Sequence, residues 1–174
     1  QEAAVLDLGT GSGAIALAIA CERLHVKVIA VDASRDALAM AEQNAKKYTL
    51  DVQFRQGHWF EPVVGEKFQL IVSNPPYLAD NDEHLAQGDI RFEPYTALVA
   101  AENGLADLRH IIEHAPSYLA SKGWLMVEHG WQQGAAVRGF MQQNGFAQIE
   151  TQRDIEGRER ATQGQCVASA VMER

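Results

Sequence analysis

The chain has 174 residues, of which 47% are hydrophobic, and its 23 acidic against 15 basic side chains give a formal net charge of -8. This composition suits one soluble domain over residues 1–174, and we expect a monomer. No run of about 18 apolar residues and no basic-then-apolar leader is present, which predicts a cytoplasmic protein that does not span a membrane. The acidic balance argues against nucleic acid as a direct partner.

The first segment passes from a strand pattern to a helix pattern through a glycine-rich turn. An apolar run at residues 3–8 is followed by Gly9-Thr10-Gly11-Ser12-Gly13 and then by the apolar residues 14–20. This order predicts a buried parallel strand, a turn and a crossover helix. Glycines let a ligand approach the backbone closely, and the helix start offers free N–H groups. The loop alone also fits a dinucleotide fingerprint.

A second strand, at residues 26–31, ends in Asp32. A carboxylate at that place can accept hydrogen bonds from the hydroxyl groups of a ribose. Ser34 is suited to cap the next helix, which we expect to continue through Tyr48. Asp32 therefore predicts a nucleoside ligand but does not say which one.

A third strand, at residues 52–56, leads to a turn at the same edge of the predicted sheet, where His58 and Trp59 lie. Trp59 suits stacking on a purine or filling the core, and we favour the ligand contact. His58 fits an adenine-edge hydrogen bond and a solvated turn position equally well. No second side chain follows His58 at metal-ligand spacing, so we expect no metal site.

The stretch Ser73-Asn74-Pro75-Pro76-Tyr77 directly follows the apolar strand at residues 68–72. Two prolines end a strand, because neither can donate a hydrogen bond to a neighbouring strand. Asn74 is then held at the strand end beside the proline carbonyls, with Tyr77 as an aromatic wall. Residues 74–77 are called the ledge below. An amide or exocyclic amine could donate both hydrogens to oxygen atoms of the ledge, which would aim its nitrogen lone pair at an electrophile. Asn74, Pro75, Pro76 and Tyr77 are therefore the candidate catalytic residues.

The polar stretch between residues 78 and 103 is long for a simple connection, which predicts a lid or substrate loop. Within it, Arg91 and Glu93 are expected to pair with each other or with other loop groups rather than to do chemistry. Cys21 and Cys166 lack paired or metal-binding spacing, so both are expected to be reduced core residues. The remaining pattern predicts a helix over residues 105–119, a strand over 123–128, a helix over 133–144 and an antiparallel edge pair over 147–151 and 166–172.

One explanation must cover both a nucleoside pocket and an amine-holding ledge. A nicotinamide enzyme would account only for the pocket. A methyl donor accounts for both, because S-adenosylmethionine carries an adenosine and an electrophilic methyl sulfonium that the cleft could point at the held nitrogen. The sequence therefore favours methyl transfer to an amide or amine.

Several stretches also resemble a known family. They are residues 5–13 with Asp32, residues 74–77, residues 88–94 with Ala97-Leu98, residues 128–130, and Asp154 with residues 157–160. Together these resemble the peptide chain release factor glutamine methyltransferases, within the class I S-adenosylmethionine-dependent methyltransferases. The resemblance covers essentially the whole chain.

This resemblance implies an α/β Rossmann-like fold, with a mostly parallel seven-stranded sheet, its last strand antiparallel, and helices on both faces. It implies methyl transfer from S-adenosylmethionine, leaving S-adenosylhomocysteine, to the N5 amide of the glutamine in the Gly-Gly-Gln motif of bacterial release factors. Residues 74–77 would hold that glutamine. His58 stands where family members often carry an acidic residue. The implied cofactor-binding residues are Asp7, Gly9, Thr10, Gly11, Ser12, Gly13, Asp32, His58, Trp59 and Asn74.

Three other functions use the same residues. A sibling enzyme would methylate a glutamine of a ribosomal protein, a nucleic-acid amino-methyltransferase would present a flipped base to the ledge, and a cofactor-binding scaffold would support another subunit. The family also carries an N-terminal domain for substrate recognition, which we expect to lie outside residues 1–174.

We therefore expect this chain to bind the cofactor but to methylate release factor poorly. A comparison of its turnover with that of a longer form tests this prediction, and equal rates would contradict it.

Overall fold

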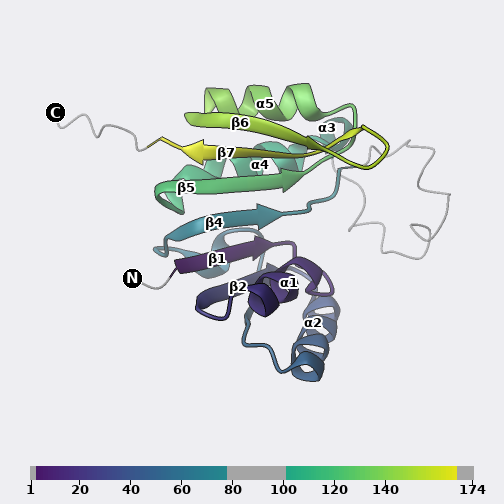
Figure 1. Cartoon of the computed structure of the whole chain (residues 1–174), viewed down its shortest axis with the longest axis vertical. Coiled ribbons are helices and arrows are strands. Elements are labelled where there is room, and N and C mark those ends of the chain that lie inside the picture. Colours follow the sequence, from purple (N-terminus) through teal and green to yellow (C-terminus); the bar gives the residue numbers. More distant parts are fainter. Residues whose placement is uncertain (1–2, 78–100, 168–174) are drawn as a thin grey trace.

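The computed structural model describes residues 3–77 and 101–167, and within them a seven-stranded sheet carries helices on both faces (Figure 1). The strand order is β3-β2-β1-β4-β5-β7-β6. The strands are β1 (Ala3–Leu8), β2 (Val26–Asp32), β3 (Gln53–Gln56), β4 (Phe68–Ser73), β5 (Leu119–Glu128), β6 (Phe146–Arg153) and β7 (Glu159–Cys166). The α-helices are α1 (Ala14–Glu22), α2 (Arg35–Tyr48), α3 (Ala101–Gly104), α4 (Ala106–His114) and α5 (Gly134–Gln143), and the 3-10 helices are η1 (Glu61–Val63) and η5 (Ala115–Ser117).

The pairing of the strands confirms the predicted fold class. Strands β1 to β5 pair in parallel, whereas β7 runs antiparallel to both β5 and β6. The order reverses between β1 and β4, because the chain first winds outward through β2 and β3 and then returns to the other side of β1. In open sheets of this kind, ligands bind outside the carboxyl ends of the strands at such a reversal.

Alternation along the strands divides the core between the two faces of the sheet. Leu6, Ile29 and Leu125 are fully buried in the larger cluster, to which α4 and α5 also contribute. Val28 and Ala30 point the other way, into a smaller cluster formed with α1. Ser34 caps α2, as predicted, since its Oγ accepts a hydrogen bond from the Ala37 N–H at 3.2 Å.

The predicted helix over residues 105–119 is wrong in its last turn. Helix α4 ends at His114, and Pro116 lies in the 3-10 turn η5, where its missing N–H costs no helical hydrogen bond. Leu119 then begins β5 and pairs with Phe68 of β4. The apolar periodicity that includes Leu119 therefore spans a helix and the start of a strand.

The last strand was predicted too late in the chain. Asp154 and Arg158 close a tight turn through a hydrogen bond from the Asp154 N–H to the Arg158 carbonyl, so the chain returns to the sheet at Glu159. The strand ends at Cys166 instead of beginning there. The antiparallel edge pair itself is confirmed.

The predicted core position of Cys21 is also wrong. Its side chain is exposed, because Ala20 already occupies the buried stripe of α1 and the next residue lies about 100° further round the helix. Cys166 is half-buried, and both thiols are free of disulfides. The predicted lid, with Arg91, Glu93 and residues 88–98, lies mainly outside the described residues. Among the described helices, none is long and apolar enough to cross a bilayer.

Candidate active site

The glycine-rich turn joins β1 to α1 at the carboxyl edge of the sheet. Gly9, Gly11 and Gly13 have φ angles of 69°, 56° and 86°, which L side chains rarely adopt. A Cβ on Gly13 would lie 3.1 Å from Ala41 Cβ, whereas a Cβ on Gly11 would meet nothing within 4 Å. The turn is therefore packed against α2 on one side and open on the other, where a ligand could approach.

Asp7 lies beneath this turn and holds its shape. It is only 1% exposed, and its Oδ2 accepts hydrogen bonds from Thr10 Oγ1 at 2.6 Å and from the Ala16 N–H at 3.1 Å. Its other oxygen, Oδ1, is buried and has no hydrogen-bond partner among the described residues. Burial raises the pKa of Asp7 to about 6, against the smaller opposite effect of these two hydrogen bonds.

This raised pKa predicts how the stability of the fold depends on pH. Between the ordinary value of 3.8 and about 6, the folded protein keeps a proton on Asp7 that the unfolded chain releases, so rising pH removes stability. Asp7→Asn cannot ionise. We compare the free energy of unfolding of this variant with that of wild type at each pH. Between roughly pH 4 and pH 7, the difference should change by about 3 kcal/mol in favour of the variant.

Urea unfolding at several pH values would measure this difference. Asp51→Asn, at an exposed position, serves as the matched control and should run parallel to wild type. Parallel profiles for wild type and Asp7→Asn would contradict the predicted ionisation of a buried carboxyl group.

Asp32 is the second carboxylate that hydrogen-bonds to the turn. Its Oδ2 accepts from the Gly11 N–H at 2.8 Å, and its Oδ1 accepts from the Ser34 N–H at 2.8 Å. Each carboxylate oxygen has two lone pairs, so both can accept a further hydrogen bond. Asp32 is half-exposed, and it lies where the sequence predicts a ribose-binding carboxylate.

Trp59 lies against the first glycine of the turn. A Cβ on Gly9 would be only 3.3 Å from Trp59 Cζ3, and Trp59 itself has a φ of 47°, a strained value for a large residue. Its half-buried ring also packs on the larger core cluster, so the structure fits both predicted roles. His58 is exposed, with its ring edge-on to that of Trp59 at a centroid distance of 5.2 Å.

The ledge lies directly beside the turn. Leu8 of β1 pairs with Ser73 of β4, and Ser73 Oγ donates to the Leu8 carbonyl at 2.8 Å. The next residues of the two strands are Gly9 and Asn74, which therefore leave the sheet side by side. Asn74 is exposed, Pro75 is buried, and Pro76 and Tyr77 are half-buried. The sequence prediction that both sets meet at one edge is confirmed by this register.

Two residues at this edge were not identified from the sequence as parts of the site. Gly104 packs against the Tyr77 carbonyl, and the side chain of Gln133 hydrogen-bonds to it. Gln133 stands three residues after Gly130, which is the spacing of a helix-capping side chain. That spacing could have identified its bond to Gly130, but no local signal identifies Tyr77 as its second partner.

The fold and this edge together define a Rossmann-like domain of the methyltransferase class, with a glycine turn, an acidic residue after β2 and a polar ledge after β4. Residues 1–91 match the model of the methyltransferase small domain, and the chain belongs to that family.

Curated relatives are about half identical to this chain over the aligned residues. It is 53% identical to the release factor glutamine methyltransferase of Aliivibrio fischeri over 94% of the chain and 58% of the relative. It is 50% identical to that of Escherichia coli K12 over 94% of the chain and 60% of the relative. The chain thus spans about three fifths of the length of these relatives. A methyltransferase from Pyrococcus furiosus shares the fold, with a TM-score of 0.72 and 16% identity over 94% of this chain and 75% of that one.

Proposed function

We propose that this chain is the catalytic domain of a methyltransferase that acts on the N5 amide of the glutamine in the Gly-Gly-Gln motif of bacterial release factors. The observation that carries the proposal is the pairing of Leu8 with Ser73, which brings the glycine turn and Asn74 to adjacent points of one edge. The identity of 50% and more to release factor glutamine methyltransferases supports the choice of substrate.

The residues around the turn fit S-adenosylmethionine as the methyl donor. The open side of Gly11 admits the methionine portion close to the backbone, and the spare lone pairs of Asp32 suit ribose hydroxyl groups. Trp59 offers an aromatic face beside Gly9 for the adenine. The unpartnered Oδ1 of Asp7 adds an acceptor beneath the turn, which favours a ligand with a positive charge. Thr10, Ser12, Gly13 and the exposed His58 complete the proposed pocket.

When bound, S-adenosylmethionine would supply an electrophilic methyl group, and its transfer to the amide nitrogen would leave a neutral thioether and release one amide proton to water. The part of the chain in this step is positioning. Asn74 Oδ1 and one of the carbonyls of Pro75 and Pro76 would accept the two amide hydrogens and so orient the nitrogen lone pair toward the methyl donor. Tyr77 limits the tilt of the amide plane. Orientation of this kind is worth an effective molarity of roughly 10⁵ M or more.

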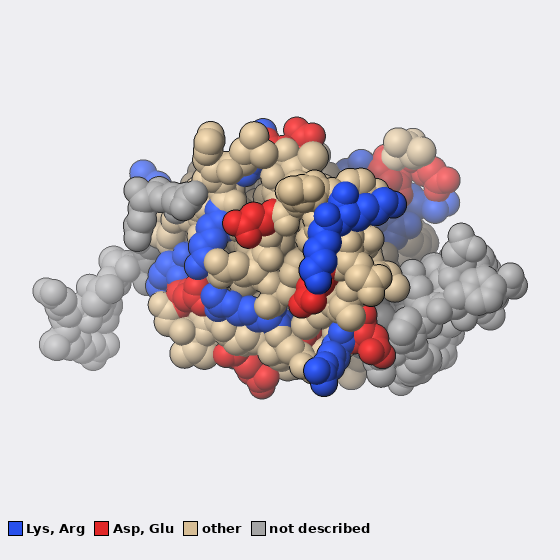
Figure 2. Space-filling model, turned by 90° about the horizontal axis from the view of Figure 1, so that it is seen from below, with Lys and Arg blue, Asp and Glu red and all other residues tan. Residues whose placement is uncertain are grey.

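We also infer that the partner is a protein in the cytoplasm rather than a nucleic acid. The face seen in Figure 2 carries Lys and Arg side chains interspersed with Asp and Glu. Lys27 and Arg55 both form ion pairs with the single carboxylate of Glu66, which offsets part of their positive charge. A phosphate backbone is instead recognised by clustered, unpaired basic side chains.

Incubation with labelled methyl donor and purified release factor, ribosomal protein or transfer RNA tests the proposal directly. We expect label in the release factor alone, and none when the glutamine of its Gly-Gly-Gln motif is replaced by alanine. Label in the ribosomal protein or the RNA would contradict the proposed substrate. Absence of transfer to all three, by this chain and by a longer form, would contradict the proposed activity.

A further inference from the structure

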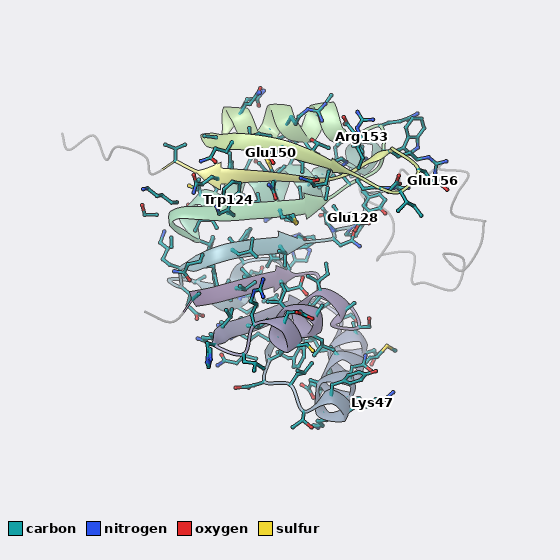
Figure 3. All side chains as sticks on the ribbon, in the orientation of Figure 1. Lys47, Trp124, Glu128, Glu150, Arg153 and Glu156 are labelled. Carbon is teal, nitrogen blue, oxygen red and sulfur yellow. The ribbon has the colours of Figure 1, made fainter. Side chains whose placement is uncertain are left out.

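Tyr77, the last residue of the ledge, is held at both its ends by residues at the exit of β5. Its hydroxyl donates to Glu128 Oε1 at 3.2 Å, and its carbonyl oxygen accepts from Gln133 Nε2 at 3.0 Å. Glu128 ends β5 at the same edge of the sheet where β4 ends (Figure 3). The two contacts define the position of the Tyr77 main chain as well as the direction of its ring.

Gln133 is itself oriented by the main chain next to it. Its Oε1 accepts from the Gly130 N–H at 2.8 Å, while its own N–H donates to the Gly130 carbonyl at 2.9 Å. The side-chain bond and the backbone turn bond together fix Gln133 against Gly130, just before α5 begins. Because Oε1 is engaged with Gly130, the amide plane of Gln133 presents Nε2 to Tyr77.

The junction around these contacts leaves little room for movement. Gly104 lies so close that a Cβ there would be 2.1 Å from the Tyr77 carbonyl oxygen and 2.8 Å from Gln133 Nε2. On the other side, His129 is fully buried, donates through Nδ1 to the Gly130 carbonyl and bonds through Nε2 to Thr162. Gly130, which orients Gln133, is therefore linked through His129 to Thr162 in β7.

We propose that Gln133 is a positioning residue for methyl transfer: by bridging Gly130 and Tyr77, it holds the end of the ledge on which the substrate amide is oriented. Its catalytic consequence rests on the proposed function, whereas the bridge itself does not. Loss of the bridge should disturb the geometry of the transition state more than the binding of the cofactor.

Gln133→Leu removes the hydrogen bonds to Gly130 and Tyr77 and keeps a similar volume. We expect kcat toward release factor to fall roughly 10- to 100-fold, with the affinity for S-adenosylhomocysteine changed by less than about twofold. Gln132→Leu, the same substitution at the exposed neighbouring position, is the control and should keep the wild-type kcat.

Gln133→Glu separates positioning from a general loss of structure. Its carboxylate can still accept from the Gly130 N–H but has no hydrogen to give the Tyr77 carbonyl, whereas the protonated acid can donate. The ratio of its kcat to that of wild type should therefore rise as the pH is lowered toward about 5. A ratio that does not change with pH would overturn the role of the donated hydrogen bond.

Hydrogen exchange at the Gly130 amide, whose N–H donates to Gln133 Oε1, tests the bridge without any substrate. Faster exchange in Gln133→Leu than in Gln132→Leu supports it, and equal exchange overturns it. If wild type transfers methyl groups and Gln133→Leu keeps the same kcat, the positioning role is wrong while the proposed function stands. If wild type transfers no methyl groups, the proposed function is wrong. The hydrogen-exchange comparison then still tests whether Gln133 forms the bridge.

Discussion

Replacing Asn74 by alanine should abolish methyl transfer while leaving cofactor affinity nearly unchanged. In the proposed site, the Asn74 oxygen accepts one of the two amide hydrogens whose directions set the orientation of the nitrogen lone pair. A primary amide is a poor nucleophile, because its lone pair is delocalised into the carbonyl, so the reaction depends strongly on that orientation. We expect kcat/KM to fall by about 10³-fold, the size typical of losing one well-placed polar group in a transition state.

Two further variants sharpen the measurement on Asn74. Asn74→Asp keeps an acceptor oxygen, so it should retain more transfer than Asn74→Ala. Asn144→Ala removes an asparagine whose side chain bonds to the Phe140 carbonyl at the end of α5, and it should have wild-type kinetics. Titration calorimetry with S-adenosylhomocysteine would report cofactor affinity separately. Turnover that survives in Asn74→Ala would count against the ledge mechanism, whereas a matching loss of cofactor affinity would assign Asn74 to the pocket instead.

The sequence predicts those features of the fold and site that depend on local signals. The apolar runs of β1 and β2, the glycine turn, the Ser34 cap and the stop at Pro75 each act within a few residues. Strand order then places Asp32 and Asn74 at the same edge, because parallel strands joined by crossover helices share their direction. For this reason the positions of these site residues could be inferred before the structure was known.

The parts that could not be predicted depend on contacts between distant segments. Gln133 meets Tyr77 across 56 residues, and only the packing of α3, α4 and the β5 exit brings them together. Trp59 adopts a left-handed backbone that its own residue type disfavours, so its placement over Gly9 must be imposed by its surroundings. Periodicity also misplaced Leu119, since a buried leucine serves equally in a helix and a strand.

Gly104→Ala should be among the most damaging single substitutions in the chain. Its φ of 81° disfavours any side chain, and the added Cβ would lie 2.1 Å from the carbonyl oxygen of Tyr77, so the backbone must shift. We expect the free energy of unfolding to fall by about 2–4 kcal/mol. Because the atom that it strikes belongs to the ledge, methyl transfer should fall as well, even at temperatures where the variant remains folded.

Gly139→Ala is the matched control, because the same added methyl group has the opposite expected effect there. Gly139 lies inside α5, its Cβ would meet nothing within 4 Å, and alanine favours a helix over glycine by about 1 kcal/mol. This variant should therefore be slightly more stable than wild type and fully active. Denaturant unfolding and single-turnover transfer on both variants would decide the matter. A Gly104→Ala protein as stable and active as Gly139→Ala would show that Tyr77 has room to move, and that the close packing around Gln133 does not fix the ledge.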